Sequence, residues 1–138
     1  MPVKKSSTET QVIKTMKDWL ALKKIYTLRL QTGSLMTSYN GNRVMVPLCP
    51  TGTPDLFTLI NGKPVFFEVK KDQVEVDKWR KHVANFLKTN FEPVSYARDL
   101  AQYRTHKEIE KNGGRVFLVC DLLEMEQIVN SVQNESNS

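Results

Sequence analysis

Apolar side chains recur every three to four positions in four stretches of the chain, which is the period of an amphipathic helix. The first stretch, residues 8–24, carries its apolar stripe on Val12, Met16 and Leu20. The other three predict helices over residues 73–89, over residues 99–112 and from about residue 122 onward. Between them lie short runs rich in β-branched and aromatic residues, which favour strands. These runs are residues 25–30, 43–46, 55–60, 64–70 and 115–120.

Turn-forming residues separate the predicted elements. Asn40-Gly41 and Asn61-Gly62 are typical of hairpin turns, and Gly113-Gly114 is typical of a helix end. Ser6 and Glu9 fit a capping box at the start of the first helix. The resulting order of helix, strands, two helices, strand and helix predicts a mixed α/β fold.

The length of the chain predicts the number of domains, and its net charge bears on the kind of partner. The chain has 138 residues, and a domain takes about 100–200, so we expect one domain over residues 8–133. Residues 1–7 and 134–138 are polar and are expected to be flexible. The net charge of +5 is compatible with an anionic partner such as nucleic acid. The chain contains no apolar run of transmembrane length and no secretory signal, so we expect a cytoplasmic protein.

Three ionisable side chains in the middle of the chain are spaced so that a sheet can bring them together. Glu68 and Lys70 are two residues apart on a predicted strand and therefore share a face. Phe67 and Val69 face the opposite layer. Asp55 begins the preceding strand of the same predicted hairpin, so it can lie beside Glu68. Two carboxylates and one ammonium group then converge at one edge of the sheet.

This grouping suits the hydrolysis of phosphodiester bonds. Paired carboxylates bind Mg²⁺ or Mn²⁺, and a neighbouring lysine can stabilise a developing oxyanion. The chain has no zinc-type spacing of His and Cys, no P-loop and no G-x-S-x-G motif, so zinc, ATPase and serine-esterase chemistry have no support. The alternative is a solvated strand face on which Glu68 and Lys70 belong to ordinary cross-strand ion pairs.

The same segment resembles the signature of the PD-(D/E)XK nuclease superfamily, with Pro54-Asp55 followed by Glu68-Val69-Lys70. The wider pattern is similar to the VRR-NUC branch, the virus-type replication-repair nucleases. That branch has a glutamate early in the first helix, an arginine strand that leads to a glycine, and a later helix with a glutamine. The residues that match these features are Glu9, Arg29, Gly33 and Gln102.

The resemblance implies a restriction-endonuclease-like core, in which helices flank a mixed central β-sheet. It also implies Mg²⁺ or Mn²⁺ as the cofactor, bound by Asp55 and Glu68, with the Val69 carbonyl as a possible third ligand. Glu9 would contact a metal through water or directly in a second site. The residues alone leave open that Glu9 only caps the first helix.

The resemblance implies that Lys70 positions or activates the attacking water and that Gln102 orients Lys70 or a phosphate. The alternative for Gln102 is a solvent-facing position on its helix. His106 lies one turn further on; the alternatives for it are the cleft that Gln102 faces and, as we expect, a surface position. About thirty residues separate the E-V-K strand from the glutamine, more than in compact members of the branch. The helix at residues 73–89 is therefore interpreted as part of an insertion over about residues 72–98.

Basic residues are available to contact DNA phosphates, which supply affinity rather than sequence specificity. The predicted contacts are Arg29, Lys71, Arg43 and Arg104. The inserted helix also has an apolar face with Trp79, which must be buried for the helix to be stable. That face packs either on its own chain or, as we expect, at a dimer interface or the DNA entrance.

The leading hypothesis is a Mg²⁺- or Mn²⁺-dependent endonuclease for branched, flapped or duplex DNA. The resemblance implies a structure-selective enzyme of phage or mobile-element replication and repair, in the cytoplasm of a bacterial or phage-infected cell. It also implies a homodimer, because stand-alone members of the branch are expected to pair. The alternatives are a catalytically weak nucleic-acid-binding module on the same fold and an interaction domain whose carboxylates form ion pairs.

Overall fold

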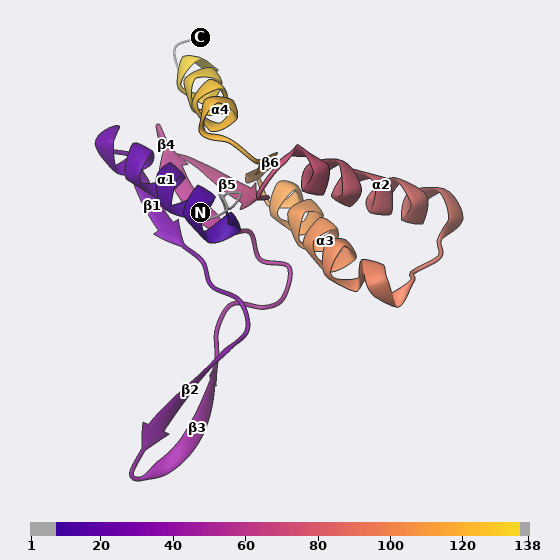
Figure 1. Ribbon diagram of the computed structural model, residues 1–138. Coiled ribbons are helices and arrows are strands. Elements are labelled where there is room, and N and C mark those ends of the chain that lie inside the picture. The colour runs from indigo at the N-terminus through magenta and orange to yellow at the C-terminus, as the bar shows by residue number, and fades with distance from the viewer. Residues whose placement is uncertain (1–7, 136–138) are drawn as a thin grey trace, which may run out of the picture.

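The structure, a computed structural model, describes residues 8–135 and shows a β-sheet flanked by helices, with one hairpin projecting from it (Figure 1). The helices are α1 (Glu9–Leu22), α2 (Gln73–Thr89), the short 3₁₀ helix η1 (Val94–Tyr96), α3 (Ala97–Lys111) and α4 (Leu122–Glu135). The strands are β1 (Tyr26–Arg29), β2 (Ser34–Tyr39), β3 (Asn42–Pro47), β4 (Leu56–Ile60), β5 (Lys63–Val69) and β6 (Arg115–Val119). The predicted mixed α/β fold is confirmed. In this part of the chain no helix is long and apolar enough to cross a membrane.

The main sheet has the strand order β1-β4-β5-β6. β4 pairs antiparallel with both β1 and β5, whereas β6 runs parallel to β5, so the sheet is mixed. A parallel neighbour needs a long crossover connection, and here α2, η1 and α3 form it. The helix predicted over residues 73–89 is confirmed and lies within this crossover.

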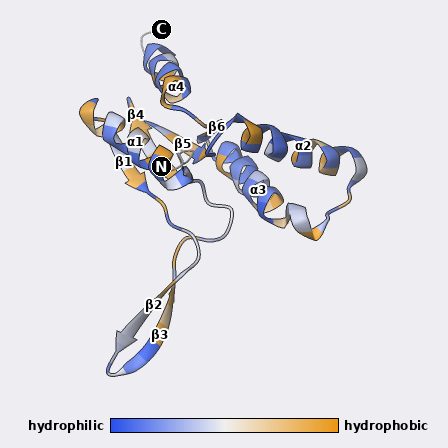
Figure 2. Ribbon diagram, viewed as in Figure 1, coloured by the Kyte–Doolittle hydropathy of each residue, from blue (hydrophilic) through white to orange (hydrophobic). Residues whose placement is uncertain are grey.

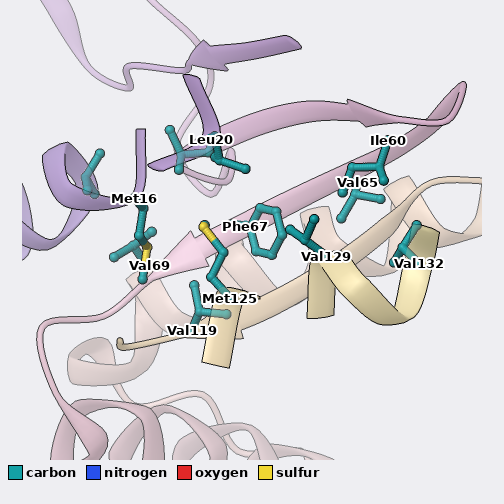
Figure 3. Packing of buried hydrophobic residues seen from close by; sticks show 12 residues of the cluster. Met16, Leu20, Ile60, Val65, Phe67, Val69, Val119, Met125, Val129 and Val132 are labelled. Atoms are coloured by element: carbon teal, nitrogen blue, oxygen red, sulfur yellow. The ribbon is translucent and has the colours of Figure 1, made fainter. Parts of the chain in front are cut away.

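One face of the sheet forms the main hydrophobic core. Val65, Phe67 and Val69 alternate along β5 and are fully buried on this face. α1 and α4 cover it, and Figure 3 shows Met16 and Met125 of these helices close to the β5 side chains. Burying one such side chain contributes about 1.5–3 kcal/mol. The core therefore anchors the strand that carries Glu68 on its other face.

The opposite face of β5 is covered by α3. On this face β5 carries Phe66, whose ring packs on Phe57 of β4 with centroids 5.0 Å apart. Gly114, at the turn after α3, permits a close approach, because a Cβ there would lie 2.6 Å from a side-chain methyl of Ile109. A polar side chain of α3, His106, reaches the sheet at Glu68.

The start of α1 differs from the prediction. Thr8 is the N-cap: its hydroxyl accepts the N–H of Gln11 at 3.2 Å, and the Gln11 side chain accepts the N–H of Thr8 at 2.8 Å. The predicted pairing of Ser6 with Glu9 is therefore wrong, and Ser6 lies outside the described residues. Because Gln11 completes the capping box, the carboxylate of Glu9 is not used for capping.

The other end of the described chain also differs. Residues 134 and 135 continue α4, so the prediction of a flexible tail from residue 134 is wrong for these two. The carboxylate of Glu135 accepts a hydrogen bond of 2.6 Å from Arg115 on β6, which ties the end of the helix to the sheet edge. Residues 1–7 and 136–138, for which flexibility is predicted, lie outside the described residues.

A two-stranded hairpin, β2–β3, projects from the sheet between β1 and β4 (Figure 1). The turn at Asn40-Gly41 is confirmed, whereas its first strand, Ser34–Tyr39, is not among the predicted strands. Every residue of both strands is exposed. Figure 2 shows hydrophobic positions along this projecting hairpin, whereas α2 and α3 are mostly hydrophilic. An isolated two-stranded hairpin is only marginally stable in water.

Candidate active site

Asp55 lies directly before β4, and continuing the β4–β5 register by one residue places it opposite Glu68. Its Oδ2 accepts a hydrogen bond of 2.8 Å from the backbone N–H of Val69. Its Oδ1 accepts one of 3.1 Å from the guanidinium of Arg29. Both carboxylate oxygens are therefore held in place beside Glu68.

Glu68 is buried on the face of β5 that α3 covers, with 2% of its surface exposed. Its Oε1 lies 3.1 Å from Nε2 of His106. Burial, reinforced by the negative charge of Asp55, raises the pKa of Glu68 well above the usual range of a carboxyl group. Burial and the positive charge of Lys70 lower the pKa of His106 to about 4. His106 is therefore neutral near pH 7 and can donate its Nε2–H to an ionised Glu68.

The prediction of a surface position for His106 is wrong, because only 4% of the residue is exposed. α3 makes one turn between Gln102 and His106, so both side chains lie on the same side of this helix. The imidazole stacks on the indole of Trp79, with ring centroids 5.5 Å apart and planes inclined by 25°. The spacing of four residues from Gln102 is the sequence signal that points to His106.

Lys70 follows β5 and is also buried, on the same side as Glu68. Its Nζ donates a hydrogen bond of 3.1 Å to Oε1 of Gln102. The same oxygen accepts a hydrogen bond of 2.9 Å from Nε1 of Trp79. The alternative of a solvent-facing Gln102 is wrong, because this residue is 4% exposed. The side-chain oxygen of Gln102, which the N–H of Trp79 also holds in place, therefore sets the direction of the Lys70 ammonium group.

The indole of Trp79 packs within its own chain and does not form a dimer face, contrary to that part of our expectation. It lines the cavity beside Lys70, so a place at the DNA entrance stays a prediction. It is 8% exposed, donates to Gln102 and packs on His106. Val76 and Val83, one turn to either side on α2, are buried as well. The apolar face of α2 is therefore buried by packing within the same chain.

Glu9, the first residue of α1, is half-buried and faces the same region. Burial and the charge of Asp55 raise the pKa of Glu9, while the charges of Lys70 and Arg98 act in the opposite direction. Glu9 and Lys70 both line a cavity of about 370 Å³. The carboxylate of Glu9 is therefore available to the site.

The four basic residues predicted to contact nucleic acid are dispersed. Arg29 donates hydrogen bonds within the chain, to Asp55 and to the carbonyl of Leu30, and so helps to build the site. Lys71 is exposed and lines the cavity beside Lys70. Arg104 pairs with a glutamate on the connector before α3. Arg43 lies on β3 in the projecting hairpin, outside the site.

Asp55 and Glu68 supply the hard oxygen donors that Mg²⁺ and Mn²⁺ prefer. Among residues 8–135, no group of three or more His, Cys, Asp and Glu side chains is arranged to hold a metal ion. Mg²⁺ does not require such a cage, because it is usually bound by one or two carboxylates and keeps several waters. The raised pKa of Glu68 means that this buried carboxyl group takes up a proton, which a divalent ion can replace. The pair therefore fits such an ion, and ligation by Glu9 and the Val69 carbonyl stays a prediction.

Gly52 holds the loop that carries Asp55 against α3. Its φ of +99° favours glycine, and a Cβ there would lie 2.5 Å from the carbonyl oxygen of Ala101 and 2.8 Å from Oγ1 of Thr105. We expect Gly52→Ala to separate the loop from α3 and to lower the free energy of unfolding by about 1–3 kcal/mol. Urea denaturation followed by circular dichroism measures this loss.

Gly62→Ala is the matched control. Gly62 has a φ of +78°, but no neighbouring atom lies within 4 Å of the position of an added Cβ. The control therefore shares the backbone strain but lacks the overlap with neighbouring atoms. Its loss in the free energy of unfolding should be smaller than that of Gly52→Ala. Equal losses in the two variants would contradict the docking role of Gly52.

The structure gathers the five residues predicted for catalysis and adds two that sequence reasoning did not place there. The five are Glu9, Asp55, Glu68, Lys70 and Gln102, and the two are Trp79 and His106. They come from α1, the loop before β4, the end of β5, α2 and α3, so five segments that are distant in the sequence form the site. Comparison with family models, curated proteins and solved structures finds no match for this chain.

Proposed function

We propose that this protein is a Mg²⁺- or Mn²⁺-dependent nuclease that hydrolyses phosphodiester bonds of DNA, on a core of the restriction-endonuclease type. The observation that carries the proposal is the half-buried Asp55 opposite the buried Glu68, beside Lys70, whose ammonium group is oriented by Gln102. Two carboxylates repel a phosphate unless a cation lies between them. A surface that only binds DNA gains nothing from such a pair, whereas a metal-dependent hydrolase requires one.

An ordinary ion pair on a solvated strand does not account for these residues. Glu68 and Lys70 are both buried, and no ion pair joins them within residues 8–135. The carboxylate contacts His106 and the ammonium group contacts Gln102 instead. Buried ionisable groups with perturbed pKa values are typical of functional sites.

In the proposed reaction, Asp55 and Glu68 would hold a divalent ion, which when bound would supply an activated water and positive charge for the phosphate. His106 donates its Nε2–H to Glu68 and thereby orients the metal-binding carboxylate. Gln102, held by Trp79, directs the ammonium group of Lys70. Lys70 orients the attacking water and stabilises the negative charge that develops on the phosphate.

The expected substrates are branched, flapped and duplex DNA of phage or mobile-element replication and repair, because the motif order resembles the VRR-NUC branch. The test is incubation of the protein with a panel of such DNAs and single strands, in Mn²⁺, Mg²⁺ or EDTA. We expect cleavage with either metal, and no cleavage in EDTA or by Glu68→Gln. A protein that binds these DNAs but cuts none of them with Mn²⁺ or Mg²⁺ would be a binding module instead.

Divalent metal should stabilise the native protein, and more so as the pH rises. At about one hundred times the Kd, mass action adds about 2.7 kcal/mol to the free energy of unfolding, which raises Tm by several degrees. Because metal and proton compete for Glu68, whose pKa is raised, the metal-induced rise in Tm should grow between pH 6 and pH 9. Differential scanning fluorimetry with Mn²⁺ and with EDTA measures both effects.

The metal-free protein should follow the opposite trend. Native Glu68 keeps a proton that the unfolded chain releases above its ordinary pKa of 4.5, so this group destabilises the fold as the pH rises toward the native pKa. Glu68→Gln imitates the protonated side chain, keeps an oxygen for His106 and should remove this part of the pH dependence. A metal-induced shift of wild-type size in Glu68→Gln would exclude Glu68 as a ligand.

We also propose that the protein pairs with a second copy through the β2–β3 hairpin. The register places Leu35, Val44 and Val46 on one face of the hairpin, and all three are exposed. Arg43, the one charged residue of the hairpin, is paired with Ser38 on the other face. An apolar, uncharged face complements itself, and a two-fold pair would bury it on both copies.

A second apolar patch supports the same partner. Tyr26, Leu28 and Leu59 are exposed on one side of β1 and β4, next to the root of the hairpin. A standard interface takes about 800 Å² from each partner, so we expect the hairpin face and this patch to contribute to it together. β1 is an edge strand of the main sheet and the hairpin follows it directly in the chain, which suits one two-fold interface.

We expect a dimer by size-exclusion chromatography with light scattering, and a monomer for the double variant Leu35→Glu, Val44→Glu. Met36→Glu is the matched control, because Met36 is exposed on the other face of the same strand. It should remain dimeric. A monomeric wild-type protein, or a double variant of unchanged size, would contradict the interface.

A further inference from the structure

The cavity of about 370 Å³ beside the candidate site extends well beyond the residues assigned to chemistry. Glu9, Lys70 and Trp79 form the wall that it shares with that site. The rest of its wall comes mainly from α2, η1 and the start of α3, which belong to the crossover between β5 and β6. The cavity therefore adjoins the proposed reaction centre on the side of the crossover helices.

Three cationic side chains of this wall point to an anionic occupant. They are Lys71, Lys78 and Arg98, all exposed. Within residues 8–135, none of the three takes part in an ion pair. An unpaired cation that lines a concave surface is free to bind a phosphate oxygen.

The acidic groups of the wall do not cancel this charge. Asp99 lies 2.6 Å from the ring nitrogen Nδ1 of His82 and is occupied by that contact. Glu75 and Glu9 are the remaining carboxylates of the wall. Lys70, Lys71, Lys78 and Arg98 outnumber the three carboxylates of the wall, Asp99 included, by four to three. The cavity therefore carries a net positive charge beside the acidic pair of Asp55 and Glu68.

We propose that this cavity binds a phosphate of the nucleic-acid strand that adjoins the phosphate to be cleaved, between Lys78 and Arg98. The crossover helices are then a substrate-binding element. This inference rests on the proposed function, because it takes the substrate to be a nucleic acid. The volume is at the lower end of the range for small-molecule sites and fits one nucleotide unit rather than a duplex.

The physical need for such a subsite follows from the charge of the reaction centre. Asp55, Glu68 and Glu9 repel the strand on either side of the one phosphate that a divalent ion can neutralise. Cations at the next phosphate offset this repulsion and fix the position of the strand along the site. Lys78 and Arg98 come from different elements, α2 and α3, so a phosphate between them also bridges the two helices.

The experiment measures the affinity of a short, fluorescein-labelled single-stranded DNA by anisotropy, in EDTA and over a range of salt concentrations. Lys78→Ala and Arg98→Ala should each weaken binding several-fold and reduce the salt slope by about 0.7. The double variant Lys78→Ala, Arg98→Ala should bind the DNA about tenfold more weakly than the wild-type protein, or weaker still. Lys81→Ala is the matched control, because Lys81 is exposed on the same helix but does not line the cavity. All of these side chains are exposed, so Tm should stay unchanged.

Two results would overturn the subsite. One is a double variant whose affinity and salt slope equal those of Lys81→Ala. The other is a double variant that loses the binding of inorganic phosphate but keeps that of the strand, which would make the cavity a site for free anions. Cleavage is scored separately: if wild-type protein binds through Lys78 and Arg98 but cuts nothing with Mn²⁺, the proposed nuclease activity fails and the subsite stands. If the double variant cuts with wild-type kcat/KM, the subsite fails and the activity stands.

Discussion

Lys70→Ala should reduce the rate of DNA cleavage by about 10²–10³, the loss that follows removal of one preorganised charge-stabilising group. The ammonium group is buried, hydrogen-bonded to Gln102 and adjacent to the carboxylate pair. No water can replace it with the same charge and direction. Single-turnover kinetics with saturating protein measure the loss in the chemical step, independently of DNA affinity.

The variant should still fold, and the structure gives the reason. Gln102 keeps its second donor, the indole N–H of Trp79, so no buried acceptor is left without a partner. The affinity for DNA in EDTA should therefore stay close to that of the wild-type protein. Cleavage by Lys70→Ala at the wild-type rate would remove Lys70 from the chemistry and leave the binding module as the better description.

Trp79→Ala should lower the free energy of unfolding by about 3–5 kcal/mol, the usual loss for removing a buried tryptophan. The indole is enclosed between α2 and α3, where it donates to Gln102 and packs on His106. The resulting cavity would lie directly behind the two residues that orient Lys70 and Glu68. Cleavage should therefore fall as well, even at temperatures at which the variant is folded.

Trp79→Phe separates the two contributions of the indole. It keeps an aromatic ring near His106 and removes only the N–H, whose hydrogen bond contributes about 0.5–1.5 kcal/mol. Trp79→Phe should therefore lower the free energy of unfolding much less than Trp79→Ala does. The oligomeric size should be unchanged in both variants. Trp79→Ala with wild-type stability would contradict the enclosed position of the indole.

The central part of the site could be predicted because it depends on local rules. Residues two apart on a strand share a face, so Glu68 and Lys70 had to lie together once β5 formed. A tight hairpin at Asn61-Gly62 sets the register that places Asp55 opposite Glu68. The helix at residues 73–89 followed from its period and from the Asp72 cap, whose side chain accepts the N–H of Glu75 at 2.9 Å.

The remainder depends on contacts between distant segments, which periodicity does not encode. His106 reads as a surface residue on a mostly polar helix, and only the packing of α3 on β5 buries it against Glu68. Arg29 fits a phosphate contact by sequence, yet the pairing of β1 with β4 turns it toward Asp55. Strand Ser34–Tyr39 has no buried face, so the alternation that marks ordinary strands is absent from it.

The main hydrophobic core contains no residue of α2 or α3. Its buried members come from α1, from β4, β5 and β6, and from α4, whereas Val76, Trp79, Val83 and Leu100 are buried apart from it. Native proteins open in cooperative units, and a unit that shares few buried contacts with the core opens at a lower free energy than global unfolding. We expect the α2–α3 pair to be such a unit, because none of its residues belongs to the main core. Its opening would withdraw Gln102 and His106 from Lys70 and Glu68 while the carboxylates stay anchored on an intact sheet, so we expect the molecule to lose the proposed catalytic arrangement and regain it without global unfolding.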